Sequence, residues 1–156
     1  MSDTTTEETF FGGIADEFLQ HYRTGPRFIA VTGMAGSDPA RAADELAARL
    51  RDRGQDAQRA TRGDETGADE FRSGTVVPFR AGDGVLVVDG PGLLEPDFSG
   101  FWNFSVWIEH DADRDADWSY VSRGQRDAVG AAREVASVLM DDAFADGPRR
   151  LFADSC

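Results

Sequence analysis

The chain has 156 residues, of which 40% are hydrophobic and 29% are charged, as expected for one globular domain with a single core. The formal net charge is −13 and all 16 basic residues are arginines, so electrostatic repulsion argues against nucleic acids and anionic membranes as partners. A single cysteine, Cys156, excludes an internal disulfide, and the longest apolar run is too short to cross a bilayer. Together with an amino terminus that lacks a basic and an apolar signal region, these properties predict a cytoplasmic protein.

An amphipathic helix is predicted near the amino terminus. Residues 1–9 are polar and are expected to form a disordered tail. Over residues 10–23, four apolar residues then recur at helical spacing: Phe11, Ile14, Phe18 and Tyr22. Neither a linker nor a repeat interrupts the rest of the chain, so residues 10–156 are predicted to form one domain.

The centre of the predicted fold is a strand, a glycine turn and a helix. Phe28–Val31 is an unbroken apolar run, which is typical of a strand buried on both faces of a parallel sheet. Gly33 and Gly36 indicate a tight turn, Asp38 is suited to cap the following helix, and Gly54 marks the end of that helix. This order of elements aims backbone N–H groups at the place where a phosphate could bind.

The turn has the outline of the phosphate loop G-x-x-x-x-G-K-[ST] but lacks its reactive residues. Counted from Gly33, the second glycine is replaced by Asp38, the lysine by Pro39 and the magnesium-binding hydroxyl by Ala40, and the chain has no lysine elsewhere. A carboxylate beside a phosphate costs about 1 kcal/mol in water and about 4 kcal/mol at a partly buried site. The candidate phosphate-binding residues are Gly33, Gly36, Ser37, Asp38 and Arg41. Arg41 is either a phosphate clamp or a solvated helix residue.

Strands and helices alternate along the rest of the chain. We expect strands over residues 57–61, 85–89 and 104–109, a loop over 62–74, a short extended segment over 75–79, and helices over 113–122 and 125–143. This alternation predicts an α/β fold with a mainly parallel sheet and right-handed crossovers.

Three blocks of sequence carry a resemblance to a known family. They are Pro26–Ser37 followed by Ala43–Gly54, then Val85–Asp97 followed by Phe101–Ile108, and finally Pro148–Asp154. In this order they resemble the uridine kinase-like P-loop nucleoside kinases, which include the phosphoribulokinase type. The resemblance implies a three-layer P-loop kinase-like fold and, in active members, ATP and Mg²⁺ as cofactors.

The same resemblance implies roles for residues outside the loop. Asp89, at the end of an apolar run, falls where the family has an acid associated with Mg²⁺; otherwise it accepts hydrogen bonds from the following turn. Asp64 falls near the aspartate that takes the proton from the nucleoside hydroxyl, with a plain loop carboxylate as the alternative. Arg123 and Arg126 resemble the arginines of a lid over the phosphates; the alternative is a helix start with surface arginines.

The chain departs from the family in its degenerate loop, in a shortened region between its second and third strands, and in ending before the expected last strand. The fold is therefore predicted to be trimmed at its carboxyl terminus, leaving an uncovered flank near Phe101, Trp102 and Trp107. The carboxylates over residues 111–117 lack the glycine and glutamate of a calcium loop, so no metal site is predicted.

The leading functional hypothesis is a degenerate nucleoside kinase-like protein that does not transfer phosphate from ATP. Such a protein would act by binding a nucleoside-like small molecule or a protein partner and would need no cofactor. The alternatives are an active small-molecule kinase with an atypical loop, using ATP and Mg²⁺, and a structural homodimer subunit.

Overall fold

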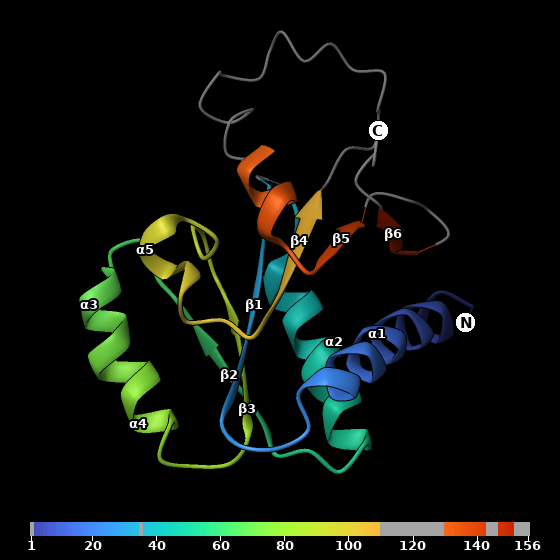
Figure 1. The fold of residues 1–156 in the computed structure, drawn as a ribbon. Coiled ribbons are helices and arrows are strands. Elements are labelled where there is room, and N and C mark those ends of the chain that lie inside the picture. Colours follow the sequence, from blue (N-terminus) through green and yellow to red (C-terminus); the bar gives the residue numbers. More distant parts are fainter. Residues whose placement is uncertain (1, 35, 110–129, 143–146, 152–156) are drawn as a thin grey trace, which may run out of the picture.

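The computed structural model describes residues 2–34, 36–109, 130–142 and 147–151, which form a six-stranded sheet covered by helices (Figure 1). The strands are β1 (Arg27–Gly33), β2 (Ala57–Thr61), β3 (Val85–Asp89), β4 (Phe104–Glu109), β5 (Val138–Asp141) and β6 (Arg149–Leu151). Their order across the sheet is β2-β3-β1-β4-β5-β6, and only the β5–β6 pair among these described strands is antiparallel. The predicted α/β fold with a mainly parallel sheet is confirmed.

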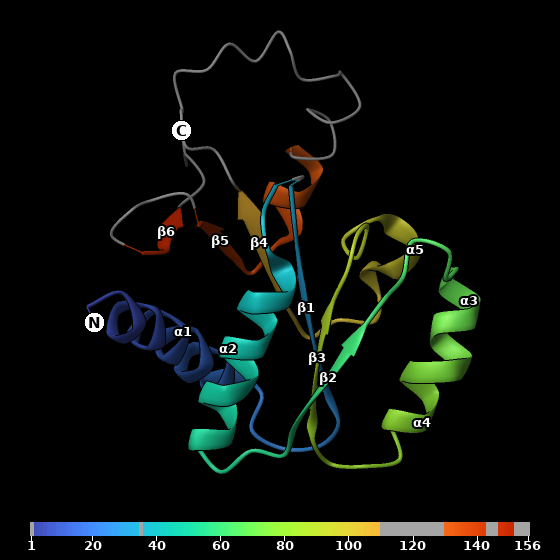
Figure 2. The same ribbon diagram turned by 180° about the vertical axis from the view of Figure 1, so that it is seen from behind.

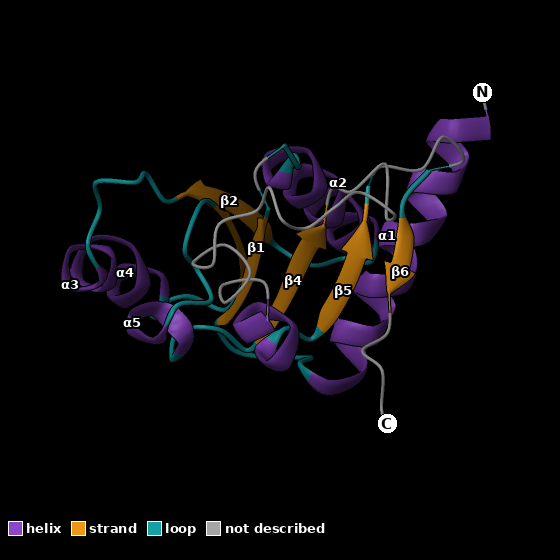
Figure 3. Cartoon of the chain, turned by 90° about the horizontal axis from the view of Figure 1, so that it is seen from above, coloured by secondary structure: helices purple, strands orange, loops and turns teal. Residues whose placement is uncertain are grey.

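Helices pack on both faces of this sheet. On one face, α1 (Ser2–His21) and α2 (Pro39–Asp52) lie side by side (Figure 2). The other face carries α3 (Ala68–Phe71), η1 (Arg72–Val76), α4 (Val77–Phe79), α5 (Pro96–Ser99) and a short helix over residues 130–135. Seen from above, α3, α4 and α5 lie together and apart from α1 and α2 (Figure 3). These are the three layers expected of the fold.

Strand residues alternate between two apolar cores. Ile29 and Val31 of β1 pack with α1 and α2, whereas Phe28 and Ala30 of the same strand pack with the helices on the opposite face. Each of these four residues is at most 3% exposed. Burying a large apolar side chain stabilises a fold by about 1.5–3 kcal/mol, so the apolar run that predicted β1 also explains why β1 is central.

Residues 2–9 form the first turns of α1, which begins at Ser2, whereas the sequence pattern predicted a helix from residue 10 after a disordered tail over residues 1–9. Two ion pairs hold this part of α1 on α2. They join Glu7 to Arg41 at 2.8 Å and Glu8 to Arg49 at 3.7 Å. The partners are far apart in sequence, so the polar composition of the segment gave no sign of them.

Residues 68–79 are helical, which corrects two predictions: a loop that extended to residue 74 and an extended segment over 75–79. The helical stretch passes through the π-helical turn η1, which brings the buried residues Phe71 and Val76 onto the same apolar core. A spacing of five residues does not match the usual helical period, and this is why the pattern was missed.

The predicted helix over residues 125–143 is wrong at its end, since Val138–Asp141 is the buried strand β5. Residues 125–129 and the predicted helix over 113–122 lie outside the described residues. Beyond β5, β6 continues the sheet, so the flank beside β4 that was expected to be uncovered carries two further strands. Within the described residues, no helix is both long and apolar enough to span a membrane.

Candidate functional site

The turn after β1 is closely packed at its first glycine. A Cβ atom on Gly33 would lie 2.5 Å from Ser37 Oγ and 2.6 Å from the carbonyl oxygen of Ile108, so only glycine fits there. Gly36 has a φ of +91°, which also favours glycine. The Ser37 hydroxyl donates a hydrogen bond to the carbonyl oxygen of Met34 at 2.6 Å. These candidate phosphate-binding residues therefore maintain the turn itself.

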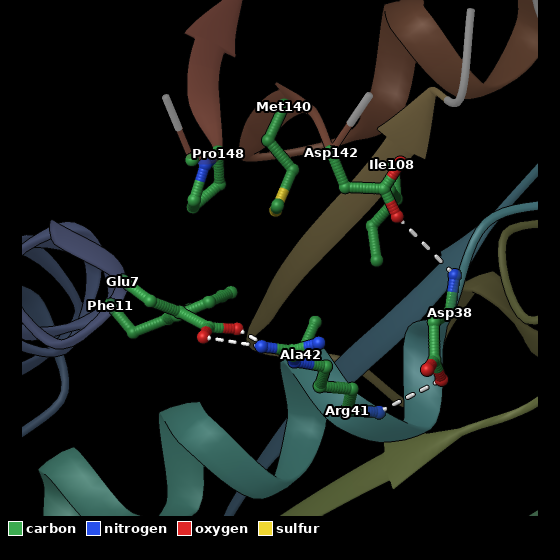
Figure 4. Close-up of a pocket in the computed structure, with 10 residues that line it drawn as sticks. Glu7, Phe11, Asp38, Arg41, Ala42, Ile108, Met140, Asp142 and Pro148 are labelled. Carbon is green, nitrogen blue, oxygen red and sulfur yellow. Dashed lines mark hydrogen bonds and ion pairs between the residues drawn. The ribbon is translucent and has the colours of Figure 1, made fainter. Parts of the chain in front are cut away.

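Two carboxylates accept hydrogen bonds from backbone N–H groups at the start of α2. Asp38 caps the helix, as predicted, by accepting a hydrogen bond from the Arg41 backbone N–H at 3.1 Å. The backbone N–H of Asp38 in turn donates to Asp142 Oδ2, which follows β5, in a long hydrogen bond of 3.4 Å (Figure 4). Backbone N–H groups at this position are the ones that bind a phosphate in a working loop. Here they donate to negatively charged side chains.

The Arg41 side chain forms an ion pair within the protein, whereas a phosphate clamp would have its guanidinium directed at a ligand. Its Nε and Nη2 donate to the two carboxylate oxygens of Glu7 at 3.0 and 2.8 Å. Hydrogen bonding to Glu7 raises the pKa of the Arg41 guanidinium above its ordinary value. Arg41 thus links α2 to α1, a contact that neither predicted alternative included.

Asp89 is buried at the end of β3 and is already paired with a cation. Its Oδ1 accepts hydrogen bonds from Arg59 Nη2 and from the Thr61 hydroxyl, each at 2.7 Å. The Nε of Arg59 donates to Asp44 of α2 at 2.8 Å, so the guanidinium bridges the sheet and the helix. Arg59 was not among the predicted site residues, although a basic residue two positions before the end of a predicted strand could have indicated a partner for Asp89.

Asp64 lies in an exposed turn between β2 and α3. The neighbouring Arg62 occupies the space between this turn and the one after β3: its guanidinium stacks on the Phe98 ring at 4.5 Å and donates to the carbonyl oxygen of Pro91 at 2.7 Å. A Cβ atom on Gly90 would lie 2.5 Å from the carbonyl oxygen of Arg62. The two turns are therefore packed on each other by the protein's own residues.

The predicted lid arginines, Arg123 and Arg126, lie outside the described residues, as do the carboxylates over residues 111–117. The described chain places Arg133 in a bidentate ion pair with Glu109, the last residue of β4. Glu109 is 3% exposed, so this pair neutralises a second buried acid at the carboxyl edge of the sheet. No group of three His, Cys, Asp or Glu side chains in the described ranges is arranged to hold a metal ion.

A cavity of about 260 Å³ opens beside the start of α2 (Figure 4). It is lined by Glu7, Phe11, Asp38, Arg41, Ala42, Ile108, Met140, Asp142, Gly147 and Pro148. Its polar rim carries three carboxylates and one guanidinium, and most of the rest is apolar. No sequence motif pointed to this cavity, because its lining comes from both ends of the chain.

The chain has a P-loop kinase-like α/β fold with a six-stranded, mainly parallel sheet. Among solved structures, the chain is similar to "a Possible Uridine Kinase from Bacillus stearothermophilus", with a TM-score of 0.59, 11% identity, and coverage of 87% of this chain and 98% of that chain. It is also similar to a "putative fructose transport system kinase from Silicibacter sp. TM1040", with a TM-score of 0.48, 15% identity, and coverage of 79% and 88%. The first likeness supports the uridine kinase-like fold. No protein-family model and no curated protein sequence matches the chain.

Proposed function

We propose that this protein is a kinase-like domain that does not bind or transfer the phosphate of ATP and that acts by binding a small molecule or a protein partner. The observation that carries the proposal is the pair of carboxylates, Asp38 and Asp142, at the amino-terminal N–H groups of α2. They take the hydrogen bonds that a bound phosphate would accept, and they repel it electrostatically.

The remaining parts of the site favour the same proposal. Asp89 is neutralised by Arg59, Arg41 is held by Glu7, and the loop offers neither a lysine nor a hydroxyl at the usual positions. Loss of one preorganised charge-stabilising group lowers a catalytic rate by about 10²–10³. An active kinase would have to replace several such groups at once, and it would have to break two ion pairs to use these residues.

Calorimetric titration with Mg-ATP tests the proposal. The matched control is a chain with the loop restored by Asp38→Gly, Pro39→Lys and Ala40→Ser together. We expect no heat of binding for the natural chain at millimolar Mg-ATP and measurable binding for the restored chain. Binding by the natural chain, or phosphoryl transfer to a nucleoside, would show that the atypical loop works and would support the active-kinase alternative.

The homodimer alternative rested on an uncovered sheet flank with three aromatic residues nearby as apolar anchors, of which Phe101 and Trp107 are buried and Trp102 is partly buried. Phe101 and Trp107 are each 8% exposed, and Trp102 Nε1 donates to the carbonyl oxygen of Leu93 at 2.7 Å. These three side chains alone therefore do not favour self-association, and the homodimer stays an untested alternative. Light scattering at high protein concentration decides it: a stable dimer would support the structural-subunit alternative, and a monomer would remove it.

A further inference from the structure

We infer that the outer edge of β2 binds an extended, basic segment of a partner protein, which adds a strand to the sheet. This inference rests on the proposed function, because it names a class of partner for a domain that acts by binding. β2 is the last strand at one end of the sheet, and among the described strands it pairs only with β3 (Figure 3). One side of β2 therefore has no neighbouring strand.

The outer edge of β2 carries backbone groups that a further strand could use. The backbone N–H of Val85, in β3, donates to the carbonyl oxygen of Asp56 at 2.9 Å. In a parallel pair, alternate residues direct both backbone groups to the neighbouring strand, so residues 58 and 60 face β3 and residues 57, 59 and 61 face outward. Within the described chain, nothing bonds to the backbone N–H and C=O groups of Arg59 and Thr61. These two residues offer two donors and two acceptors to an added strand.

Most of this edge lacks the usual protection against pairing. Proteins commonly guard an edge strand with a proline or with a charged side chain placed across it. β2 contains no proline, and the guanidinium of its one charged residue, Arg59, is held over the sheet by Asp44 and Asp89. Only the start of the strand is covered, where Arg51 Nε donates to the carbonyl oxygen of Ala57 at 2.9 Å. The edge around Arg59 and Thr61 stays open.

A groove of about 430 Å³ lies beside β2 on the face of the sheet that carries α4. Its lining includes Gln58 of β2, Leu86 of β3, and Gly74 and Phe79 of the helical layer. Leu86 is 4% exposed and belongs to the apolar core of this face. Alternate side chains of a strand point to the same face, so every second residue of a strand added to β2 would extend toward the groove. Backbone hydrogen bonds would then supply affinity, and the groove would select the side chains.

The charge of the molecule selects a basic segment as the occupant. Asp56 lines the groove, and its exposed carboxylate forms no hydrogen bond or ion pair within the described chain. An arginine or lysine of the partner could lay its aliphatic stem on Leu86 and Phe79 and bring its charge near Asp56. A second copy of this chain is less suited, because each copy has a net charge of −13 and like charges repel.

The probe is a short peptide of alternating threonine and arginine, acetylated and amidated at its ends, because threonine favours the extended form. In a titration followed by amide chemical shifts, we expect binding at millimolar or lower concentration, with shifts at Gln58, Thr61 and Gly74. Hydrogen exchange at the backbone N–H groups of Arg59 and Thr61 should become slower in the complex. Absence of this slowing would overturn the inference, because strand addition buries these two groups.

Two control peptides separate strand addition from attraction between opposite charges. The same peptide with every backbone nitrogen methylated keeps its charge but has no backbone donors, so it should bind about tenfold more weakly. A peptide of alternating threonine and glutamate keeps its donors and reverses the charge, and it should also bind about tenfold more weakly. Equal binding of the arginine peptide and either control would overturn the proposal.

Two variants locate the interaction. A Cβ atom on Gly74 would meet no atom within 4 Å, so Gly74→Leu should fold normally, fill part of the groove and weaken peptide binding about tenfold. Its control, Gly13→Leu, is equally open on α1, on the opposite face, and should bind as the natural chain does. Asp56→Asn should weaken binding about twofold to fivefold, whereas Asp97→Asn in α5, with the same change of net charge, should not. Unchanged binding by both Gly74→Leu and Asp56→Asn would overturn the proposal.

The protein alone supplies the last comparison. If Arg59 and Thr61 are already protected from exchange and lose this protection on dilution, a second copy occupies the edge and the proposal is overturned. The Mg-ATP titration reports on the turn after β1, so its outcome does not depend on peptide binding at β2. The two proposals can therefore fail independently.

Discussion

Replacing Arg59 with methionine removes the cation that neutralises Asp89 while keeping most of the aliphatic stem. The Asp89 side chain is 9% exposed and that of Arg59 is 18% exposed, so the pair is largely withdrawn from water. After the substitution, the Thr61 hydroxyl still donates its hydrogen bond to the carboxylate. Breaking one partner of a buried pair costs about 3–5 kcal/mol, and the surviving hydrogen bond places the expected loss near the lower limit, at about 3 kcal/mol.

For a chain of this length, a loss of about 3 kcal/mol lowers the melting temperature by about 6–12 °C. Differential scanning calorimetry measures this directly. The matched control is Arg72→Met, since Arg72 forms an exposed pair with Asp69 and a contact over the Phe101 ring, and loss of both should cost only about 1 kcal/mol. If Arg59→Met and Arg72→Met lower the melting temperature equally, the buried pair of Arg59 and Asp89 does not stabilise the fold more than an exposed pair does. In a double-mutant cycle, adding Asp89→Asn to Arg59→Met should cost less than the sum of the single changes.

Five further substitutions, at four positions, test other parts of the structure by thermal unfolding. Gly33→Ala should destabilise the fold by about 1–3 kcal/mol because of the close contacts at its Cβ position. Gly13→Ala, in an open position on α1, should stabilise it by about 0.5–1 kcal/mol. A Gly33→Ala variant more stable than Gly13→Ala would show that the turn after β1 can relax. Hydrogen bonding to Arg53 lowers the pKa of Asp16. The ion pair between these two residues therefore stabilises the fold fully above pH 3.8, the ordinary pKa of an aspartate, and this stabilisation is lost as the pH falls through the lowered pKa. The melting temperatures of the natural chain and Asp16→Asn should therefore differ at neutral pH and converge in acid; a constant difference would contradict the ion pair. Asp38→Ala should cost about 0.5–2 kcal/mol and Asp38→Asn almost nothing, which separates a helix cap from a charge needed for stability.

The elements that could be predicted are those whose signals are local. An apolar run predicted β1, and an aspartate before a proline predicted the start of α2. Both predictions hold because the conformation of these segments depends mainly on residues adjacent in sequence. Strand β5 was mistaken for helix since Ala132, Ala136 and Leu139 have helical spacing, and only pairing with β4 selects the extended form of residues 138–141. Pairing with β4, rather than the local sequence pattern, therefore sets the conformation of residues 138–141.

The site was harder to predict because its partners are distant in sequence. Asp38 was correctly assigned as a helix cap, and Asp89 was correctly placed at the end of a buried strand. The residues adjacent in sequence to Asp38 do not indicate its contact with Asp142, and those adjacent to Asp89 do not indicate its pairing with Arg59. The turn after β1 therefore differs visibly from the G-x-x-x-x-G-K-[ST] pattern in sequence, whereas its contacts with Asp142 become visible only in three dimensions.

The carboxylate that follows β5 gives this fold an anion of its own at the positive end of α2. In a protein that depends on a diffusible anion at that position, the geometry of the loop varies with the concentration of the ligand. Here the counterion is covalently part of the chain, and its local concentration does not change when the protein is diluted or transferred to another buffer. The stability of this edge of the sheet should therefore be the same in cells rich in phosphate compounds and in cells depleted of them.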